Sequence, residues 1–195
     1  MSRTGTISRL TKETDVFVEL GIDGKGEGRI ATTIPFLDHM LTLFSRHGFF
    51  DLTVRGTGDT DVDYHHLVED IGICLGKAIQ EALGDKRGIP RYGSAFVPMD
   101  ESLSHVSIDV SGRPYLVFNV DFGGKKIKDF DPLLFRDFFK SLSDHGGITL
   151  HINVLYGTSP HHIAESFFKA FARAFNAATS IDDRITDVMS TKGSL

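Results

Sequence analysis

The sequence predicts an α/β protein of the two-layer α+β kind, in which a βββαβα unit is duplicated and helices pack on one face of mixed sheets. The first observation behind this prediction is that the motif His-His-x-x-Glu occurs at residues 65–69 and again at 161–165. The second is that Ser-x-His-Gly occurs at residues 45–48 and again at 143–146. The copies lie 96 and 98 residues apart, and recurrence at a nearly fixed distance indicates an internal repeat.

The first half of the chain alternates between strand and helix patterns. Four segments show the apolar and polar alternation of strands, namely residues 4–10, 14–22, 28–34 and 50–55. Pro35 begins a segment with a 3.6-residue apolar period that ends before Gly48, as expected for a helix. A second helix is predicted at residues 65–83, closed by Gly84, and residues 56–63 before it are predicted to form a loop.

The second half repeats this order. Residues 101–112 align with residues 13–24 at an offset of 88, and the two motifs above follow at matching places. We therefore predict a first repeat at residues 1–90 and a second at residues 91–184, joined as a single compact unit. Residues 185–195 lack periodicity and form a polar C-terminal tail.

Composition excludes several classes of protein. The 195 residues are 41% hydrophobic, which is ordinary for a globular protein with a core. A net charge of −5 argues against a nucleic-acid partner, which usually requires a basic face. The apolar runs are too short to span a membrane and the N-terminus lacks the pattern of a signal peptide, so we expect a cytoplasmic protein without a membrane partner. The single cysteine, Cys74, lies in an apolar run and is predicted to be a small core residue.

The duplicated motif is suited to binding metal. Residues four apart on a helix share a face, so His65 and Glu69 can bind one cation together. His66 points roughly 100° away around the helix axis, so each motif offers ligands in two directions. A pair of histidines at a helix start can also serve only as a cap, but capping does not require the same three residues to recur. The recurrence favours metal binding, and two such helices could hold two metals.

The repeat also pairs residues of the preceding helices. At the offset of 98, His39 corresponds to Asp137, and both residue types can ligate a cation. The candidate ligands, four for each of two metals, are His39, His65, His66, Glu69, Asp137, His161, His162 and Glu165. Each motif is expected to share its metal with one histidine of the other motif. Six-coordinate ions would keep positions open for substrate or water, which is typical of catalysis.

The donor types limit the choice of metal. Imidazole nitrogens and carboxylate oxygens without sulfur suit Mn, Fe, Co or Zn, and room for six ligands favours manganese. We therefore predict two Mn²⁺ per subunit.

Four further segments, together with the two His-His-x-x-Glu motifs, resemble the imidazoleglycerol-phosphate dehydratase family over nearly the whole chain. They are PFLDHM at 35–40, SGRPY at 111–115, FFKA at 167–170 and STKG at 190–193. The resemblance implies the duplicated fold, dependence on manganese, and a homo-oligomer, a 24-subunit assembly with active sites between subunits.

The resemblance also implies a reaction and the residues that perform it. Members of this family are hydro-lyases of histidine biosynthesis that dehydrate D-erythro-imidazole-glycerol phosphate to imidazole-acetol phosphate, and the substrate imidazolate would be held by two metals. Glu13 matches the acid/base glutamate of the family. The matches to its phosphate-binding residues, which include the C-terminal tail, are Arg91, Arg113, Lys169, Ser190 and Lys192.

Three positions depart from the family pattern. Leu43 stands where relatives often have Gln, Tyr64 stands where an acidic residue is common, and Asp137 stands where many relatives have His. The residues alone also fit a dinuclear metallohydrolase acting on a phosphorylated small molecule, or a structural scaffold whose metals only join subunits. Release of phosphate would distinguish the hydrolase, and a lack of turnover would distinguish the scaffold.

Overall fold

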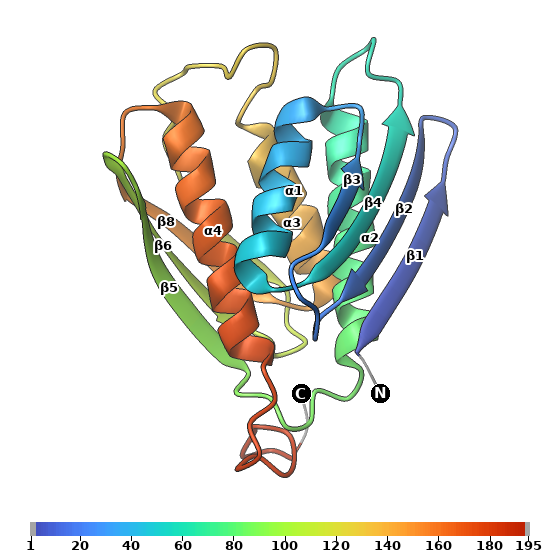
Figure 1. Ribbon diagram of the computed structural model, residues 1–195, viewed down its shortest axis with the longest axis vertical. Helices are drawn as coiled ribbons and strands as arrows, with labels where there is room; N and C mark the ends of the chain where they lie inside the picture. The colour runs from blue at the N-terminus through green and yellow to red at the C-terminus, as the bar shows by residue number, and fades with distance from the viewer. Residues whose placement is uncertain (1–2, 194–195) are drawn as a thin grey trace.

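The computed structural model describes residues 3–193, and in this part of the chain two four-stranded sheets lie on either side of four helices (Figure 1). The first half consists of β1 (Thr4–Leu10), β2 (Thr14–Gly21), β3 (Gly28–Ala31), α1 (Pro35–Gly48), β4 (Asp51–Gly58) and α2 (His65–Leu83). The second half consists of β5 (Tyr92–Met99), β6 (Ser102–Asp109), β7 (Tyr115–Asn119), α3 (Leu134–Gly146), β8 (Thr149–Tyr156) and α4 (Pro160–Thr179).

Both sheets have the same topology. The strand order is β1-β2-β4-β3 in the first sheet and β5-β6-β8-β7 in the second. The strands β3 and β4 run parallel because α1 connects them, and β7 and β8 run parallel because α3 does. All other neighbours are antiparallel. The duplicated βββαβα unit and the mixed sheets are therefore confirmed, and each half is a two-layer unit whose helices cover the inner face of its sheet (Figure 1).

Two boundaries differ from the sequence prediction by more than one residue. The third strand ends at Ala31 and not at residue 34, because Thr33 has a positive φ of 63° and turns the chain into α1. The fourth strand continues to Gly58, although its last residues were predicted to be loop. Gly56 pairs with Val16 in the sheet, and a Cβ there would lie only 3.2 Å from the side chain of Leu67 on α2. The glycine thus serves close packing of helix on strand and does not break the strand.

The helices of the two halves interleave. In Figure 1 the four helices lie between the sheets, with α2 packed against α3 and α1 packed against α4. Glycines on α2 permit the first contact, since a Cβ at Gly72 would lie 2.5 Å from the carbonyl oxygen of Phe138. Aromatic rings fill the second contact, where Phe44 stacks on Phe171 with ring centroids 5.1 Å apart. Each motif helix is thereby paired with a helix from the other half.

The remaining sequence predictions concern the core and the chain ends. Cys74 is fully buried, as predicted, and burial raises the pKa of its thiol to about 11. The repeat boundary at residue 90 falls between α2 and β5, and the division into repeats 1–90 and 91–184 stays a prediction. Residues 1–2 of the first repeat and 194–195 of the tail lie outside the described residues. Within the described residues, no helix is both long and apolar enough to cross a membrane.

Candidate active site

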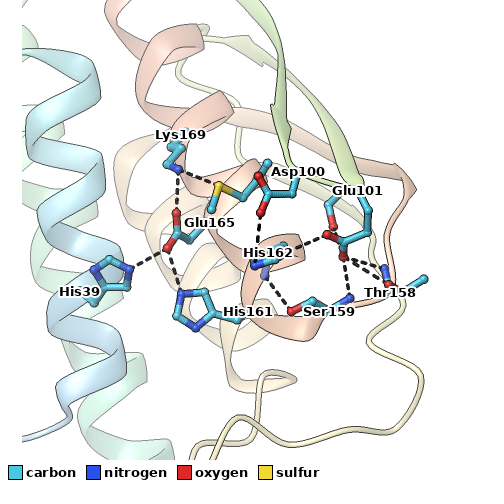
Figure 2. Close-up of polar contacts among 11 residues, drawn as sticks. His39, Asp100, Glu101, Thr158, Ser159, His161, His162, Glu165 and Lys169 are labelled. Carbon is cyan, nitrogen blue, oxygen red and sulfur yellow. Dashed lines mark hydrogen bonds and ion pairs between the residues drawn. The ribbon is translucent and has the colours of Figure 1, made fainter.

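A triad of potential metal ligands forms where α1 meets α4. His39 on α1 lies beside His161 and Glu165, which are one turn apart on α4, and all three side chains point toward one another (Figure 2). The Nε2 atoms of His39 and His161 each lie 2.9 Å from Oε1 of Glu165. One ligand atom from each residue lies within 4.8 Å of the others, which is close enough for all three to contact one cation.

Glu165 is the charged centre of this triad. It is buried, and its second oxygen, Oε2, accepts a hydrogen bond of 2.6 Å from Nζ of Lys169. Burial opposes ionisation, but the hydrogen bonds from Lys169, His39 and His161 together lower the pKa of Glu165 to about 2. The carboxylate is therefore ionised at neutral pH and available as an oxygen ligand.

A second triad forms where α2 meets α3. The Nε2 atom of His65 lies 3.6 Å from Oε2 of Glu69 on the same helix, and its Nδ1 atom lies 3.6 Å from Oδ2 of Asp137 on α3. These side chains are about half exposed, with 42–45% of each accessible to solvent. The distances are too long for direct hydrogen bonds, so the three groups surround a space and do not satisfy one another.

The two triads correspond through the repeat. His161 and Glu165 of the first triad match His65 and Glu69 of the second, so the triads differ only by a histidine, His39, in place of Asp137. Six of the eight predicted ligands are thus brought together in two groups of three. An aromatic chain links the groups, because Phe36 contacts both His161 and Phe130, and Phe130 contacts Tyr64, the residue before His65.

The other two predicted ligands, His66 and His162, point away from the triads. Nδ1 of His162 lies 2.6 Å from Oε2 of Glu101 in the β5–β6 turn (Figure 2), and Nδ1 of His66 lies 3.0 Å from Oδ2 of Asp59. The hydrogen bonds that these carboxylates accept raise the pKa of both histidines. Within one chain, therefore, each motif is completed by the preceding helix of the other half, while the predicted sharing of histidines between motifs stays a prediction.

Sequence reasoning missed the two carboxylates that hold these histidines. A signal for Glu101 was present, since the repeat aligns it with Glu13, the predicted acid/base residue. Glu13 itself lies in the β1–β2 turn, with its side chain 58% exposed and Oε2 3.9 Å from Nδ1 of His66. No comparable signal marks Asp59, because the repeat pairs it with Gly157.

The predicted phosphate-binding residues fall into two places. Lys169 lies beside Glu165, at the first triad. Arg91 is buried and forms a bidentate pair with Asp109, at 2.6 and 3.1 Å, and Arg113 approaches the same carboxylate at 3.4 Å. The C-terminal tail reaches this arginine pair, since Nη1 of Arg91 donates to the backbone oxygen of Met189 at 3.0 Å.

The arginine pair lies far from the triads in the same chain. The backbone N–H of Arg91 donates to the carbonyl oxygen of Ala178, near the C-terminal end of α4. A helix rises ~1.5 Å per residue, so Ala178 and Glu165 are roughly 20 Å apart along α4. Ser190 and Lys192 follow Met189 in the tail, where Ser190 is half-buried and Lys192 is exposed. A small ligand held by one chain's triads cannot reach that chain's arginine pair.

The departures from the family pattern also have definite places. Tyr64 donates a hydrogen bond of 2.9 Å to Oδ2 of Asp129, so its hydroxyl is turned toward the loop before α3. Asp63, which precedes Tyr64, accepts a hydrogen bond of 2.7 Å from the backbone N–H of His65, the first residue of α2. Leu43 is partly buried and packs against the core.

Comparison with known sequences gives a consistent result. The sequence model of the family described as imidazoleglycerol-phosphate dehydratase matches residues 32–175. The enzyme of that name from Syntrophus aciditrophicus is 61% identical over 194 residues, covering 99% of this chain and 98% of its own. The one from Geobacter sulfurreducens is 58% identical over 195 residues and is covered completely, as is this chain.

Solved structures agree with the sequence comparison. The crystal structure of the imidazoleglycerol-phosphate dehydratase from Staphylococcus aureus is 36% identical, with a TM-score of 0.83 over 92% of this chain and 99% of that one. The enzyme from Pyrococcus furiosus is 39% identical, with a TM-score of 0.84 over 97% of this chain and 100% of that one. The architecture, the duplicated motif and these similarities together show that the chain belongs to the imidazoleglycerol-phosphate dehydratase family.

Proposed function

We propose that this protein dehydrates D-erythro-imidazole-glycerol phosphate to imidazole-acetol phosphate, a step of histidine biosynthesis, with two manganese ions per subunit. Family membership supports the hydro-lyase class. The observation that carries the dependence on two metals is that the two copies of His-His-x-x-Glu each belong to a separate triad of nitrogen and oxygen donors. As a biosynthetic enzyme, it would work in the cytoplasm.

The donor sets fit divalent cations of the manganese type. His39, His161 and Glu165 would hold one cation, and the second would lie among His65, Glu69 and Asp137. Imidazole and carboxylate donors, with no thiolate among them, are the ligands that such ions accept. Cations bound to the two nitrogens of the substrate ring would stabilise negative charge that develops on that ring.

The outward histidines would complete the coordination across subunits. His66 and His162 point away from the triads of their own chain, so each could reach a metal held by a neighbouring copy. The sequence predicts that each metal takes one histidine from the other motif. In this arrangement that histidine would come from a neighbouring subunit. Four ligands for each metal would result, with two positions left for substrate or water.

Glu13 would act as the acid/base residue. Dehydration requires removal of a proton from the carbon next to the one that carries the leaving hydroxyl group, and the resulting enol becomes the ketone of imidazole-acetol phosphate. An exposed carboxylate on a short turn can approach the substrate chain and take this proton. Lys169 would offer its ammonium group to the bound anion after release from Glu165.

The separation of the arginine pair from the triads supports a shared site. Arg91 and Arg113, with Ser190 and Lys192 of the tail, would bind the phosphate of a substrate whose ring is held by another copy. A homo-oligomer such as the 24-subunit assembly implied by the family resemblance supplies such neighbours. Arginine forks suit a phosphate group because they can donate two parallel hydrogen bonds.

A turnover assay tests the proposal directly. Protein stripped of metal by a chelator is mixed with imidazole-glycerol phosphate, with and without Mn²⁺, and both the ketone product and free phosphate are measured. We expect ketone without free phosphate, only when metal is present, and elemental analysis should find about two metals per chain. Free phosphate would indicate the hydrolase, and bound metal without turnover would indicate the scaffold.

A further inference from the structure

Each outward histidine has one carboxylate within hydrogen-bond distance, and both contacts involve the same ring atom, Nδ1. Nδ1 of His162 lies 2.6 Å from Glu101, and Nδ1 of His66 lies 3.0 Å from Asp59. The other nitrogen of His162, Nε2, lies 3.9 Å from Oδ2 of Asp100, which is too far for a hydrogen bond. An ionised carboxylate can only accept hydrogen bonds, so Nδ1 must carry the proton in both rings. In a neutral imidazole the other nitrogen, Nε2, then has the free lone pair that a metal requires.

Glu101 is itself held in place by the chain that precedes α4. Its other oxygen, Oε1, accepts hydrogen bonds from the backbone N–H groups of Ser159 at 2.8 Å and of Thr158 at 3.2 Å (Figure 2). Oε2 is left to His162 alone among these contacts. The two oxygens therefore have different tasks, since one fixes the carboxylate and the other orients the ring.

Asp59 makes the corresponding contact at a cost in stability. Its Oδ2 atom accepts from His66, while its Oδ1 atom is buried and has no hydrogen-bond partner within the described residues 3–193. A buried carboxylate oxygen without a partner is unfavourable, so Oδ1 itself adds no stabilising hydrogen bond to the fold. The contact with His66 is what the residue provides.

The two contacts arise from different parts of the repeat. In the repeat, Glu101 corresponds to Glu13 and Asp59 corresponds to Gly157. Neither carboxylate therefore has a counterpart that forms the same hydrogen bond to a histidine. A side chain at position 157 is not tolerated, because a Cβ there would lie 2.4 Å from Oγ of Ser102. In both halves a carboxylate therefore lies beside Nδ1 of the outward histidine, although the two carboxylates are not equivalent in the repeat. This indicates that the site requires the contact, since duplication alone would have placed it at equivalent positions.

We propose that Asp59 and Glu101 are positioning residues, which hold His66 and His162 with Nδ1 protonated and Nε2 directed to a divalent cation. Because Asp59 takes this task in the first half, Glu13 lies 3.9 Å from Nδ1 of His66 and stays available to the substrate, whereas its counterpart Glu101 is occupied. The inference rests on the proposed function, since it takes the outward histidines to be metal ligands.

The test compares amide variants of the full-length protein. Glu101→Gln keeps the oxygen that accepts from Ser159 but presents an NH₂ group to Nδ1, which favours the opposite tautomer with a proton on Nε2. Asp59→Asn weakens the corresponding contact, because an amide oxygen is a poorer acceptor than a carboxylate and nothing bonded to Oδ1 fixes which amide atom faces His66. The control is Asp51→Asn, since Asp51 also accepts two backbone hydrogen bonds, from Lys25 and Glu27, but holds a different turn and no candidate metal ligand. Mn²⁺ affinity is measured by competition with a chelator, and Co²⁺ absorption reports on coordination.

We expect each of the two variants to lose roughly 10–100-fold in affinity for Mn²⁺ and to change the Co²⁺ spectrum, while the control keeps both. The thermal midpoint of the metal-free variants should stay close to that of the wild type. Mn²⁺ affinities within twofold of the wild type in both variants would overturn the inference, as would a loss matched by the control. A wild-type protein that binds no Mn²⁺ would instead overturn the proposed function, and the inference with it.

Discussion

At the scale of single residues, the two triads differ in charge. The triad with His39 carries one carboxylate and the triad with Asp137 carries two, although the repeat makes them equivalent. A harder, more negative donor set favours Mn²⁺ over ions that prefer nitrogen ligands. The two metals of one subunit should therefore be held with different selectivity.

The variant Asp137→Ala should lose one of the two metals per chain and most of the activity. Asp137→His should keep both metals but shift the preference at that triad from Mn²⁺ toward Zn²⁺. Elemental analysis after dialysis against a mixture of the two ions measures both effects. Unchanged metal content in Asp137→Ala would mean that Asp137 is not a metal ligand but only a solvent-exposed carboxylate on α3.

Glu13 is expected to contribute to chemistry and not to metal binding. Glu13→Gln should lower turnover by roughly 10²-fold or more, because the amide cannot take a proton, while the metal content stays that of the wild type. Steady-state kinetics and elemental analysis of the same preparation distinguish the two contributions. Turnover close to that of the wild type would remove Glu13 from the mechanism.

At the scale of secondary-structure elements, glycines set how closely helices approach strands. A Cβ at Gly93 on β5 would lie 2.0 Å from the carbonyl oxygen of Ala174 on α4, and the equivalent Gly5 on β1 meets Ala78 on α2 at the same distance. The repeat has kept both contacts, so both motif helices lie at the same depth against their sheets.

Gly93→Ala should therefore destabilise the protein by about 2 kcal/mol, since neither backbone can yield without moving α4. The free energy of unfolding in denaturant measures the effect. Gly21→Ala is the matched control, because a Cβ at this strand glycine would meet its nearest neighbour at an ordinary 3.7 Å. Equal stability of the two variants would show that α4 can shift away from β5 at little cost.

The turn between β2 and β3 gives the fold a dependence on pH. The hydrogen bonds from the backbone N–H groups of Lys25 and Glu27 lower the pKa of Asp51. A carboxyl group whose pKa is lowered on folding stabilises the protein above its unfolded pKa, about 3.9, and this contribution disappears as the pH falls through the folded pKa.

The variant Asp51→Asn should accordingly be less stable than the wild type at pH 6. This difference in stability should vanish as the pH falls below the pKa of the Asp51 carboxyl group in the folded protein. Because this carboxylate is accessible to solvent, we expect a difference of no more than about 1 kcal/mol. Denaturant unfolding over a series of pH values tests the sign and the window. A difference that grows with acidity would contradict the assignment.

At the scale of the whole molecule, the triads and the arginine pair lie at opposite ends of the helices. The triads lie near the N-terminal ends of α2 and α4, and the arginine pair lies near the C-terminal end of α4, where the tail follows (Figure 1). If one substrate is to contact both, the triads of one copy of the chain must therefore lie next to the arginine pair of another copy.

Mixing two inactive variants tests this arrangement. Glu13→Gln and Arg113→Ala should each have little activity alone, but subunits mixed after dissociation and then reassembled should recover part of it. Recovery is expected because some shared sites then receive Glu13 from one copy and Arg113 from another. Activity of the mixture that merely equals the average of the two variants would mean that each chain forms its own site.

The duplicated unit, the order of its elements and the residue types of the candidate site can all be predicted from the sequence. These follow from local periodicity and from offsets between repeats, which depend on near neighbours in the chain. The main errors, at the ends of β3 and β4, arose at Thr33 and Gly56, where a turn or a close helix contact overrides what the residue usually indicates.

Which of these residues come into contact depends on how the helices pack. The sequence could not show that His39 joins the second motif and Asp137 the first, because that depends on α1 packing on α4 and α3 packing on α2. It also could not bring Asp59 to His66. The contacts within the triads join segments far apart in the chain, and they are fixed by the close packing of helix on helix, which no local pattern records.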